Sequence, residues 1–289
     1  MTDGSQFGNF VRRNAAWISR TKLLPENTAT RMAVYLGNNR ALTKTVYGHK
    51  IYVDTRDHSL TPHILLDGNW EDWITKVFRT VVRDGMRVID VGANIGWYSL
   101  IAGDLVGAAG RVTSFEADPE MAEILYRNIV VNGLVDRVTV VPKAVYSESK
   151  PVEFKIHEHL KGSSSLFSTD ASAAVFNDEV SHVTVQATAI DDFLPENSVV
   201  DFMKIDAEGA EPFVLQGARR TLSENRDIQI MMEFSPAMLC AYGSAETFLG
   251  EISGLGFGVW RIAADSSLIR SSHQDLLSAG HCDVLLRRS

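Results

Sequence analysis

The sequence has little cysteine and no long run of apolar residues. Its 289 residues include only two cysteines, Cys240 and Cys282, and no Cys-x-x-Cys pair, which disfavours both a secreted disulfide framework and a structural zinc site. No stretch approaches the roughly 18 uninterrupted apolar residues of a membrane-spanning helix. Residues 1–17 have no apolar segment after their charged residues, so we expect no secretory signal. These absences predict a cytoplasmic protein.

Basic residues are scarce relative to acidic ones. Lysine and arginine number 28 against 36 aspartates and glutamates, and the net charge is −8. A protein that binds nucleic acid without sequence preference needs a basic surface that displaces counterions. The charge balance therefore argues against a nucleic-acid partner, while leaving a local basic patch open.

What remains is the composition of an ordinary globular protein. Hydrophobic residues make up 45% of the chain and charged residues 22%, and the length fits one elaborated domain or two small ones. Residues 1–45 differ from the rest, because they are basic and loosely amphipathic. We expect an N-terminal helical extension there, with helices ending near Pro25 and residues 38–39. Such an extension would serve as a cap, a substrate lid or a dimer arm, which leaves a homo-oligomer open.

From residue 46 to residue 289, apolar strand patterns alternate with helical patterns. Strands are expected at residues 46–54, 87–94, 111–119, 137–145, 199–209, 227–235, 257–262 and 282–288, and helices at 70–83, 95–107, 120–133 and 211–222. This alternation predicts a single α/β domain in which helices cover both faces of a parallel sheet. An insertion at about residues 150–190 interrupts the pattern. Two strands there flank a serine-rich segment at 161–169, which we interpret as a mobile lid.

The strongest chemical signal is the segment from Asp90 to Gly96. Its glycines follow a strand and open a helix, where they allow a sharp turn and a close approach to a ligand. Glu116 ends the next strand, 26 residues after Asp90, and an acid there can accept the hydroxyls of a cofactor's ribose. A nicotinamide cofactor (NAD) sets its pyrophosphate on the helix N-terminus, where the Asp90 carboxylate would repel it. The spacing Gly92-x-x-x-Gly96 therefore favours S-adenosylmethionine (SAM), whose sulfonium and amino groups a carboxylate attracts.

A second group of acids follows two later strands. Asp206, Glu208 and Glu211 come directly after one strand, and Glu233 ends the next. Because ligands of open α/β sheets bind at the carboxyl ends of strands, we expect these carboxylates to face a polar cleft. Glu211 precedes Pro212 and suits the first turn of a helix, so we interpret it as structural. Asp206 and Glu233 could also hold Mg²⁺, which would lower the pKa of an acceptor hydroxyl.

Three segments, VIDVGANIGWYSL, SFEADP and FMKIDAEGAEPFVLQGA, resemble the FkbM family of SAM-dependent methyltransferases. The most specific piece is KIDAEGAE at 204–211, in which Ala207 stands where most relatives have valine. The resemblance implies a Rossmann-like class I methyltransferase fold with a mostly parallel seven-stranded sheet. It also implies methyl transfer to a hydroxyl oxygen of a small molecule, a sugar or glycan, or a natural product. Residues 1–45 lie outside the resemblance.

Transfer to a hydroxyl calls for a group that takes the hydroxyl's proton. We predict that Asp206 is this base or an orienting group, with Glu208 and Glu233 nearby. The histidines that compete for the role are His63, His157 and His159. We interpret each of them as a surface or packing residue.

The cofactor is predicted to contact the first three strand ends and the helix before them. The predicted residues are Glu71, Asp90, Gly92, Ala93, Asn94, Gly96, Glu116, Ala117, Asp118, Lys143, Ala144 and Val145. Asp90 and Gly92 would hold the methionine end of SAM and Glu116 the ribose, while residues 143–145 would approach the adenine.

Two other functions stay open at this point. One is a nicotinamide-dependent oxidoreductase of the Rossmann type, which the loop spacing and the lack of a clear Tyr-x-x-x-Lys pair oppose. The other is a methyltransferase-like binding module without catalysis, which the intact Gly92, Gly96, Glu116 and Asp206 oppose.

Overall fold

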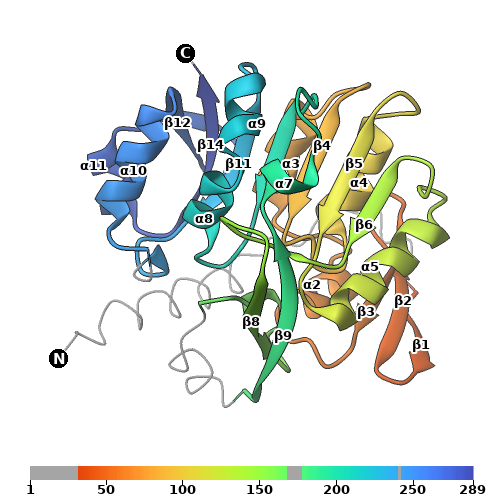
Figure 1. The fold of residues 1–289 in the computed structure, drawn as a ribbon. Helices are drawn as coiled ribbons and strands as arrows, with labels where there is room; N and C mark the ends of the chain where they lie inside the picture. Colours follow the sequence, from red (N-terminus) through yellow and green to blue (C-terminus); the bar gives the residue numbers. More distant parts are fainter. Residues whose placement is uncertain (1–31, 168–177, 240–241, 289) are drawn as a thin grey trace. The chain divides into compact units, whose positions relative to one another are not determined.

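An eight-stranded sheet, in the order β13-β12-β14-β11-β10-β4-β5-β6, organises the protein (Figure 1). The structure, a computed structural model, describes residues 32–167, 178–239 and 242–288. The strands are β4 (Arg87–Val91), β5 (Arg111–Phe115), β6 (Val138–Val141), β10 (Phe202–Ile205), β11 (Gln229–Phe234), β12 (Phe257–Ile262), β13 (Leu268–Arg270) and β14 (Cys282–Arg288). From β6 to β11 the strands run parallel, whereas β14 is antiparallel to β11 and β12. The parallel strands therefore end, and β14 begins, at one edge of the sheet. We call it the carboxyl edge, and the opposite one the amino edge.

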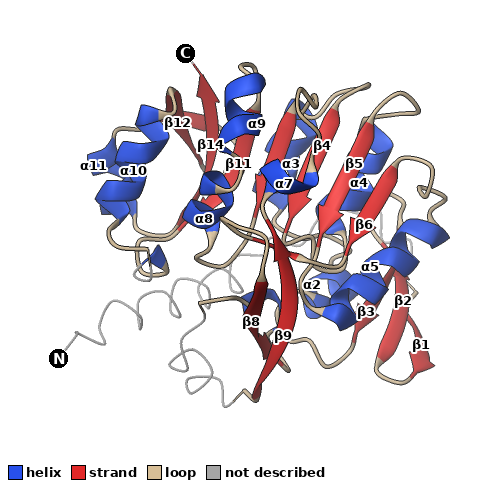
Figure 2. Cartoon of the chain, viewed as in Figure 1, coloured by secondary structure: helices blue, strands red, loops and turns tan. Residues whose placement is uncertain are grey.

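Helices cover both faces of this sheet (Figure 2). One apolar core includes residues of α2 (Thr61–Leu66), α3 (Asp72–Val81), α4 (Trp97–Leu105) and α5 (Pro119–Val131). A second includes residues of α7 (Ile190–Phe193), α8 (Glu211–Gln216), α9 (Arg219–Glu224), α10 (Ala245–Gly254) and α11 (His273–Ala279). Along β4, Val88 belongs to the first core and Ile89 and Val91 to the second, as alternating side chains require. The predicted α/β fold with a mostly parallel sheet is confirmed.

Two details differ from the sequence-based expectation. The sheet has an eighth strand, β13, which pairs antiparallel with β12 as an edge strand. The helix expected at 211–222 is divided into α8 and α9 at Gly217. A Cβ on Gly217 would lie 2.2 Å from the Tyr146 carbonyl oxygen, so the chain passes too close to its neighbour there for any other residue.

The helical extension expected over residues 1–45 is wrong for its last part. Residues of this part form β1 (Val34–Gly37) and β2 (Arg40–Lys44), which join β3 (Lys50–Asp54) in an antiparallel sheet. Asn38 and Asn39 have φ values of 50° and 57°, so they form a tight hairpin turn instead of ending a helix. The compact unit that contains the main sheet accordingly begins at Met32 and not at residue 46. Residues 1–31, with the rest of the predicted helices, lie outside the described residues.

The insertion contains the two predicted strands. β8 (Pro151–His157) and β9 (Val180–Thr188) pair antiparallel, and β9 also pairs with β7 (Ala144–Val145). A 3-10 turn, η1 (Lys161–Ser163), follows β8. The lid interpretation is wrong for residues 161–167, because Ser165 is buried and its hydroxyl donates to the Glu208 carbonyl oxygen at 2.8 Å. Among the described helices, none is long and apolar enough to cross a membrane.

Candidate functional site

The loop after β4 is held by close backbone contacts. The amides of Gly92 and Ala93 both donate to the Phe115 carbonyl oxygen on β5. Gly92 has a φ of 74°, and a Cβ at this position would lie 1.8 Å from the Asp206 carbonyl oxygen. Glycine is therefore needed at this position for two reasons: its conformation and the nearness of the chain after β10. The same contact brings the two sequence motifs together at the carboxyl edge.

Asp90 is a buried acid, and one of its two carboxylate oxygens accepts no hydrogen bond from the described residues. Its Oδ2 accepts from the Ser99 hydroxyl at 2.6 Å, whereas its Oδ1 has no partner among the described residues. Burial raises the pKa of this carboxyl group, because a charge loses its hydration there. A buried acceptor without a partner is costly, and the ammonium or amino group of a ligand would satisfy it.

Glu116 links the two loops predicted to hold the cofactor. Its Oε2 accepts from the Asn94 amide and its Oε1 from the Asp118 amide, both at 2.7 Å. Asn94 reaches this contact with a left-handed φ of 48°. Burial raises the pKa of Glu116 to about 7, although these amides lower it. Each carboxylate oxygen has a second lone pair, so Glu116 can still accept ribose hydroxyls.

The other predicted cofactor residues surround Glu116. Its amide donates to the Val141 carbonyl oxygen, which sets residues 143–145 beside it. Ala144 and Val145 are buried in β7. Asp118 caps α5 by accepting from the amides of Glu120 and Met121, so its carboxylate has a structural task that sequence analysis did not assign. Ala117 packs against the core of the insertion.

Three carboxylates meet at the carboxyl ends of β10 and β11. Oxygen atoms of Asp206, Glu208 and Glu233 lie within 4.8 Å of one another, and we call these residues the acidic group. Burial and the charges of Glu233 and Asp206 raise the pKa of Glu208 well above its ordinary value. Glu211 turns away to accept from the amides of Ala207 and Gly209, as its structural interpretation predicted.

Lys204 is a buried cation that sequence analysis missed. Its Nζ lies 2.7 Å from Asp206 Oδ2 and 4.4 Å from the centre of the Tyr98 ring. Although burial lowers the pKa of Lys204, the charges of Asp206, Glu71 and Asp90 raise it above its ordinary value. The signal in the sequence was a lysine inside an otherwise apolar, buried strand, where a charge is rarely placed without partners.

Two further residues come from the start of β14. The His281 Nδ1 lies 2.7 Å from Glu233 Oε1. Burial lowers the pKa of His281, but Glu233 outweighs this effect and raises it to about 9. Burial and the charges of Glu71 and Glu233 raise the pKa of Asp283 well above its ordinary value. Both residues reach the carboxyl edge only because β14 runs antiparallel, a direction that the sequence pattern does not reveal.

Glu71 belongs to the same surroundings. It caps α3 with a left-handed φ of 45°, and the Tyr98 hydroxyl donates to its Oε2 at 2.7 Å. Burial raises its pKa to about 7, with Lys204 lowering it and Asp206 raising it. The structure thus brings Glu71 to the carboxyl edge, where the sequence prediction put it.

The rival histidines make their contacts elsewhere. His157 Nδ1 lies 3.1 Å from Asp178 Oδ2, and His159 stacks on His58 with ring centres 5.0 Å apart. His63 lies 3.7 Å from Asp67 within α2. Within the described residues of the insertion, Ser165 contacts the acidic group through the Glu208 carbonyl oxygen.

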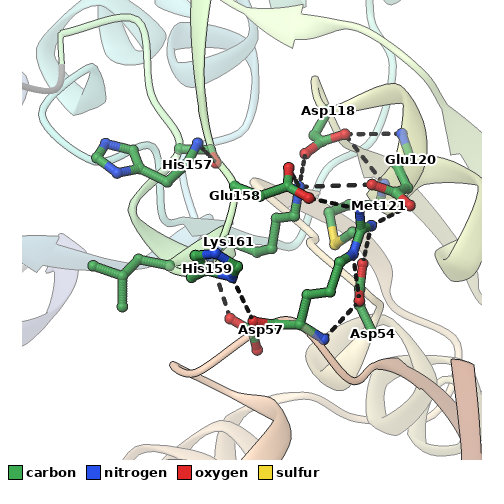
Figure 3. A network of polar contacts seen from close by, with 12 residues as sticks. Asp54, Asp57, Asp118, Glu120, Met121, His157, Glu158, His159 and Lys161 are labelled. Carbon is green, nitrogen blue, oxygen red and sulfur yellow. Dashed lines mark hydrogen bonds and ion pairs between the residues drawn. The ribbon is translucent and has the colours of Figure 1, made fainter. Parts of the chain in front are cut away.

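A network of charges fixes the insertion beside the cofactor loops (Figure 3). Arg56 contacts Asp54, Glu120 and Glu158, which come from β3, α5 and the insertion. Lys161, from η1, is buried within 3.9 Å of Asp118, 3.6 Å of Glu120 and 3.5 Å of Glu158. The insertion is therefore tied to the N-terminus of α5, which directly follows the Glu116 loop.

Comparisons with known proteins agree with the resemblance found in the sequence. Residues 90–249, more than half of the chain, match the family model described as the methyltransferase FkbM domain. A protein-L-isoaspartate O-methyltransferase 1 of Archaeoglobus fulgidus is 37% identical over 60 residues, which are 21% of this chain and 28% of that protein. The corresponding enzyme of Methanothrix thermoacetophila is 40% identical over 48 residues, 17% of this chain and 23% of that protein. These matches thus span about a quarter of the relatives' length.

Two methyltransferases are among the solved structures to which the chain is similar. A SAM-dependent O-methyltransferase of Thermotoga maritima is 14% identical, with a TM-score of 0.44, over 92% of this chain and 88% of that one. An O-methyltransferase of Bacillus cereus, in complex with S-adenosylhomocysteine (SAH), is 15% identical, with a TM-score of 0.43, over 76% of this chain and 83% of that one. The extent of the family match is decisive: the chain belongs to the FkbM family of methyltransferases.

Proposed function

We propose that the protein is a SAM-dependent O-methyltransferase that acts on a hydroxyl group of a small molecule, a sugar or glycan, or a natural product. The observation that carries the proposal is the meeting of the acid-led glycine loop with the acidic group at one edge of the sheet. The first offers contacts for a cationic cofactor, and the second offers groups that take a proton from an acceptor.

The residues around the glycine loop fit SAM, which supplies an electrophilic methyl group when bound. Asp90, with its unused Oδ1, suits the amino group of the methionine end, and Gly92 allows the close approach. Glu116 would accept the ribose hydroxyls, and residues 143–145 would border the adenine. The same Asp90 carboxylate is unfavourable for a pyrophosphate, so the contacts favour SAM over a nicotinamide cofactor.

The contacts of the acidic group suggest different roles for its members. Lys204 holds Asp206 and His281 holds Glu233, so these two carboxylates are suited to orienting the acceptor. No cationic contact of this kind is seen for Glu208 among the described residues, and its raised pKa makes its ionised form a stronger base than an ordinary carboxylate. We therefore assign proton removal to Glu208 and orientation of the acceptor oxygen to Asp206. Orientation itself accounts for much of the acceleration in a methyl transfer.

The acidic group is also close enough to hold a metal ion. However, Asp206 and Glu233 each already contact a positive side chain, and the comparisons offer no support for Mg²⁺. We propose that Lys204 and His281 supply the positive charge and that turnover survives treatment with EDTA. Loss of turnover that added Mg²⁺ restores would contradict this assignment.

An acceptor hydroxyl is favoured over an acceptor carboxylate. The curated relatives are named as methyltransferases of protein isoaspartate, whose acceptor is an acid. In this chain the acidic group, together with Glu71 and Asp283, would repel the carboxylate of such an acceptor. Neutral hydroxyl compounds meet no such penalty.

Calorimetric titration tests the cofactor first. SAH should bind to the full chain, and NAD should not. Methyl transfer from labelled SAM is then measured with polyhydroxyl acceptors, with an isoaspartyl peptide and with RNA. Label in the hydroxyl compounds supports the proposal, and label confined to peptide or RNA overturns the assigned acceptor class. Absence of SAH binding would overturn the function itself.

A further inference from the structure

A hollow opens at the amino edge of the main sheet. It has a volume of about 580 Å³, and four of its lining residues are the arginines Arg83, Arg226, Arg287 and Arg288. They come from the segments before β4 and β11 and from the end of β14, next to the C-terminus in Figure 1. The length of β4 separates this hollow from the acidic group by roughly 15 Å.

The arginines of this hollow have no acidic partners among the described residues. Arg83 donates to the carbonyl oxygens of Arg79 and Val82, and Arg287 donates to the Gln229 side-chain oxygen at 2.7 Å. Arg226 makes no hydrogen bond or ion pair within the described part of the chain. By contrast, Arg40, Arg56, Arg127, Arg137, Arg219 and Arg220 all reach carboxylates. Elsewhere Arg79 and Arg111 also form no ion pair among the described residues. What sets the hollow apart is that four such arginines gather in it, on a chain with a net charge of −8.

Arg288 lines the hollow with a guanidinium group that hydrogen bonds hold in place. Its guanidinium group donates to the carbonyl oxygens of Leu255, Asn225 and Leu222 at 2.7–3.2 Å. Burial lowers the pKa of Arg288 and the positive charge of Arg226 lowers it further, although the charge of Asp227 acts in the opposite direction. The two arginines therefore repel each other, and a bound anion would relieve that repulsion.

The acids near the hollow do not balance its charge. Asp227 is the one acidic residue among those that line it. Asp201 starts the segment leading into β10, and its Oδ2 accepts from the Arg87 amide at 2.7 Å. The hollow thus keeps an excess of positive charge on a chain that is acidic as a whole.

We propose that this hollow binds a soluble anion that carries two or more phosphate groups, at a site separate from methyl transfer. A guanidinium fork matches two oxygens of a phosphate group. The exposed Arg83 and Arg226 provide two such forks, which suits a ligand with more than one phosphate group, and Arg287 and Arg288 add positive charge to the wall. The volume lies within the range of small-molecule sites. The ligand reaches the protein from the side of the sheet opposite to the acceptor.

Inorganic pyrophosphate serves as the probe, titrated calorimetrically into the full chain at low salt. The double variant Arg83→Ala/Arg226→Ala should bind pyrophosphate at least about tenfold more weakly, because it loses two charge-assisted contacts. Arg127→Ala is the matched control, since Arg127 pairs with Glu123 on the exposed side of α5, and its affinity should equal that of the unmodified protein. SAH affinity should be the same in all three proteins, which also shows that the variants are folded.

Three results would overturn the proposal. They are no binding of pyrophosphate by the unmodified protein, equal affinity in the double variant, and an equal loss in Arg127→Ala. A second measurement tests binding of the protein to vesicles that contain phosphatidylglycerol. Binding to vesicles without binding to pyrophosphate would replace the soluble anion by a membrane surface and likewise overturn the proposal. Because SAH binding is measured separately, failure of this proposal leaves the proposed methyl transfer standing.

Discussion

The two edges of the main sheet carry opposite charges, and the charged side chains have different kinds of partner at each edge. At the carboxyl edge, Asp206 contacts Lys204 and Glu233 contacts His281, each at 2.7 Å. At the amino edge, Arg83, Arg287 and Arg288 donate to carbonyl and amide oxygens and form no ion pair within the described part of the chain. The acids thus form a network that the protein has compensated internally, while the arginines keep donors for something outside the chain.

Burial explains why the two edges differ. A charge removed from water costs several kcal/mol unless a partner meets it, and Lys204, Asp90 and Tyr98 are all buried. Arg83 and Arg226 are exposed, so water already stabilises their charges and no partner is required. Internal pairing at the carboxyl edge is therefore a condition of folding, whereas pairing at the amino edge is left to binding.

The largest effect is expected from Gly92→Ala, which tests how tightly the carboxyl edge is built. The new Cβ would lie 1.8 Å from the Asp206 carbonyl oxygen, so the chain after β10 would have to move. We expect urea denaturation to show a loss of more than about 4 kcal/mol in unfolding free energy. Gly133→Ala is the matched control, because Gly133 has a similar φ of 69° with nothing nearby, and it should lose about 1 kcal/mol. Equal losses would show that conformation alone requires Gly92.

Lys204→Met tests whether the buried acids depend on internal compensation. Without the ammonium group, Asp90 and Asp206 lose their nearest cation, and we expect a loss of about 3–5 kcal/mol in stability at pH 7. The loss should shrink as pH falls, because burial raises the pKa of Asp90 and its carboxyl group then binds a proton more readily. Lys76→Met provides the comparison, since Lys76 pairs with Asp72 on the surface of α3 and should cost less than about 1 kcal/mol. A loss no larger than that of Lys76→Met would refute internal compensation.

Glu208→Gln separates proton removal from cofactor binding at the carboxyl edge. If Glu208 takes the acceptor's proton, kcat should fall by about 100-fold or more, while SAH affinity stays unchanged. In the unmodified protein, kcat should rise with pH, because the raised pKa of Glu208 keeps it protonated at low pH. Asp206→Asn is the companion variant and should raise KM as well as lower kcat. An unchanged kcat in Glu208→Gln would assign the proton to another group.

The smallest effect concerns the pH dependence of stability. Glu71 has a pKa of about 7 in the folded protein against an ordinary value of 4.5. The folded state then binds this proton more tightly than the unfolded state, so stability falls as pH rises from about 4.5 to 7. In Glu71→Gln, urea denaturation across this window should show a decline smaller by about 2 kcal/mol. Glu123→Gln, on the exposed side of α5, should keep the original decline, and an unaltered decline in Glu71→Gln would contradict the burial of this charge.

Local sequence predicted the parts of the site that follow one another along a strand and its loop. The segment from Asp90 to Gly96 and the acid Glu116 could be placed because parallel strands bring their carboxyl ends to one edge. For the same reason Asp206 and Glu233 were expected together, and their oxygens do meet. The helix expected to end near residues 38–39 is wrong for the residues before them, because Asn38 and Asn39 form a hairpin turn between β1 and β2.

Hydrophobic pattern and motif spacing by themselves determined the class of fold and the glycine loop, and the resemblance of three short segments indicated the family, because all of these depend on short-range order along the chain. Only the tertiary structure decided which charges meet. The antiparallel direction of β14 carries His281 to Glu233, and the packing of α4 on the sheet places the Tyr98 ring against Lys204 of β10. The same strand direction carries Arg287 and Arg288 to the opposite edge. Electrostatic pairing depends on distances between segments far apart in sequence, and those distances exist only after the chain has folded.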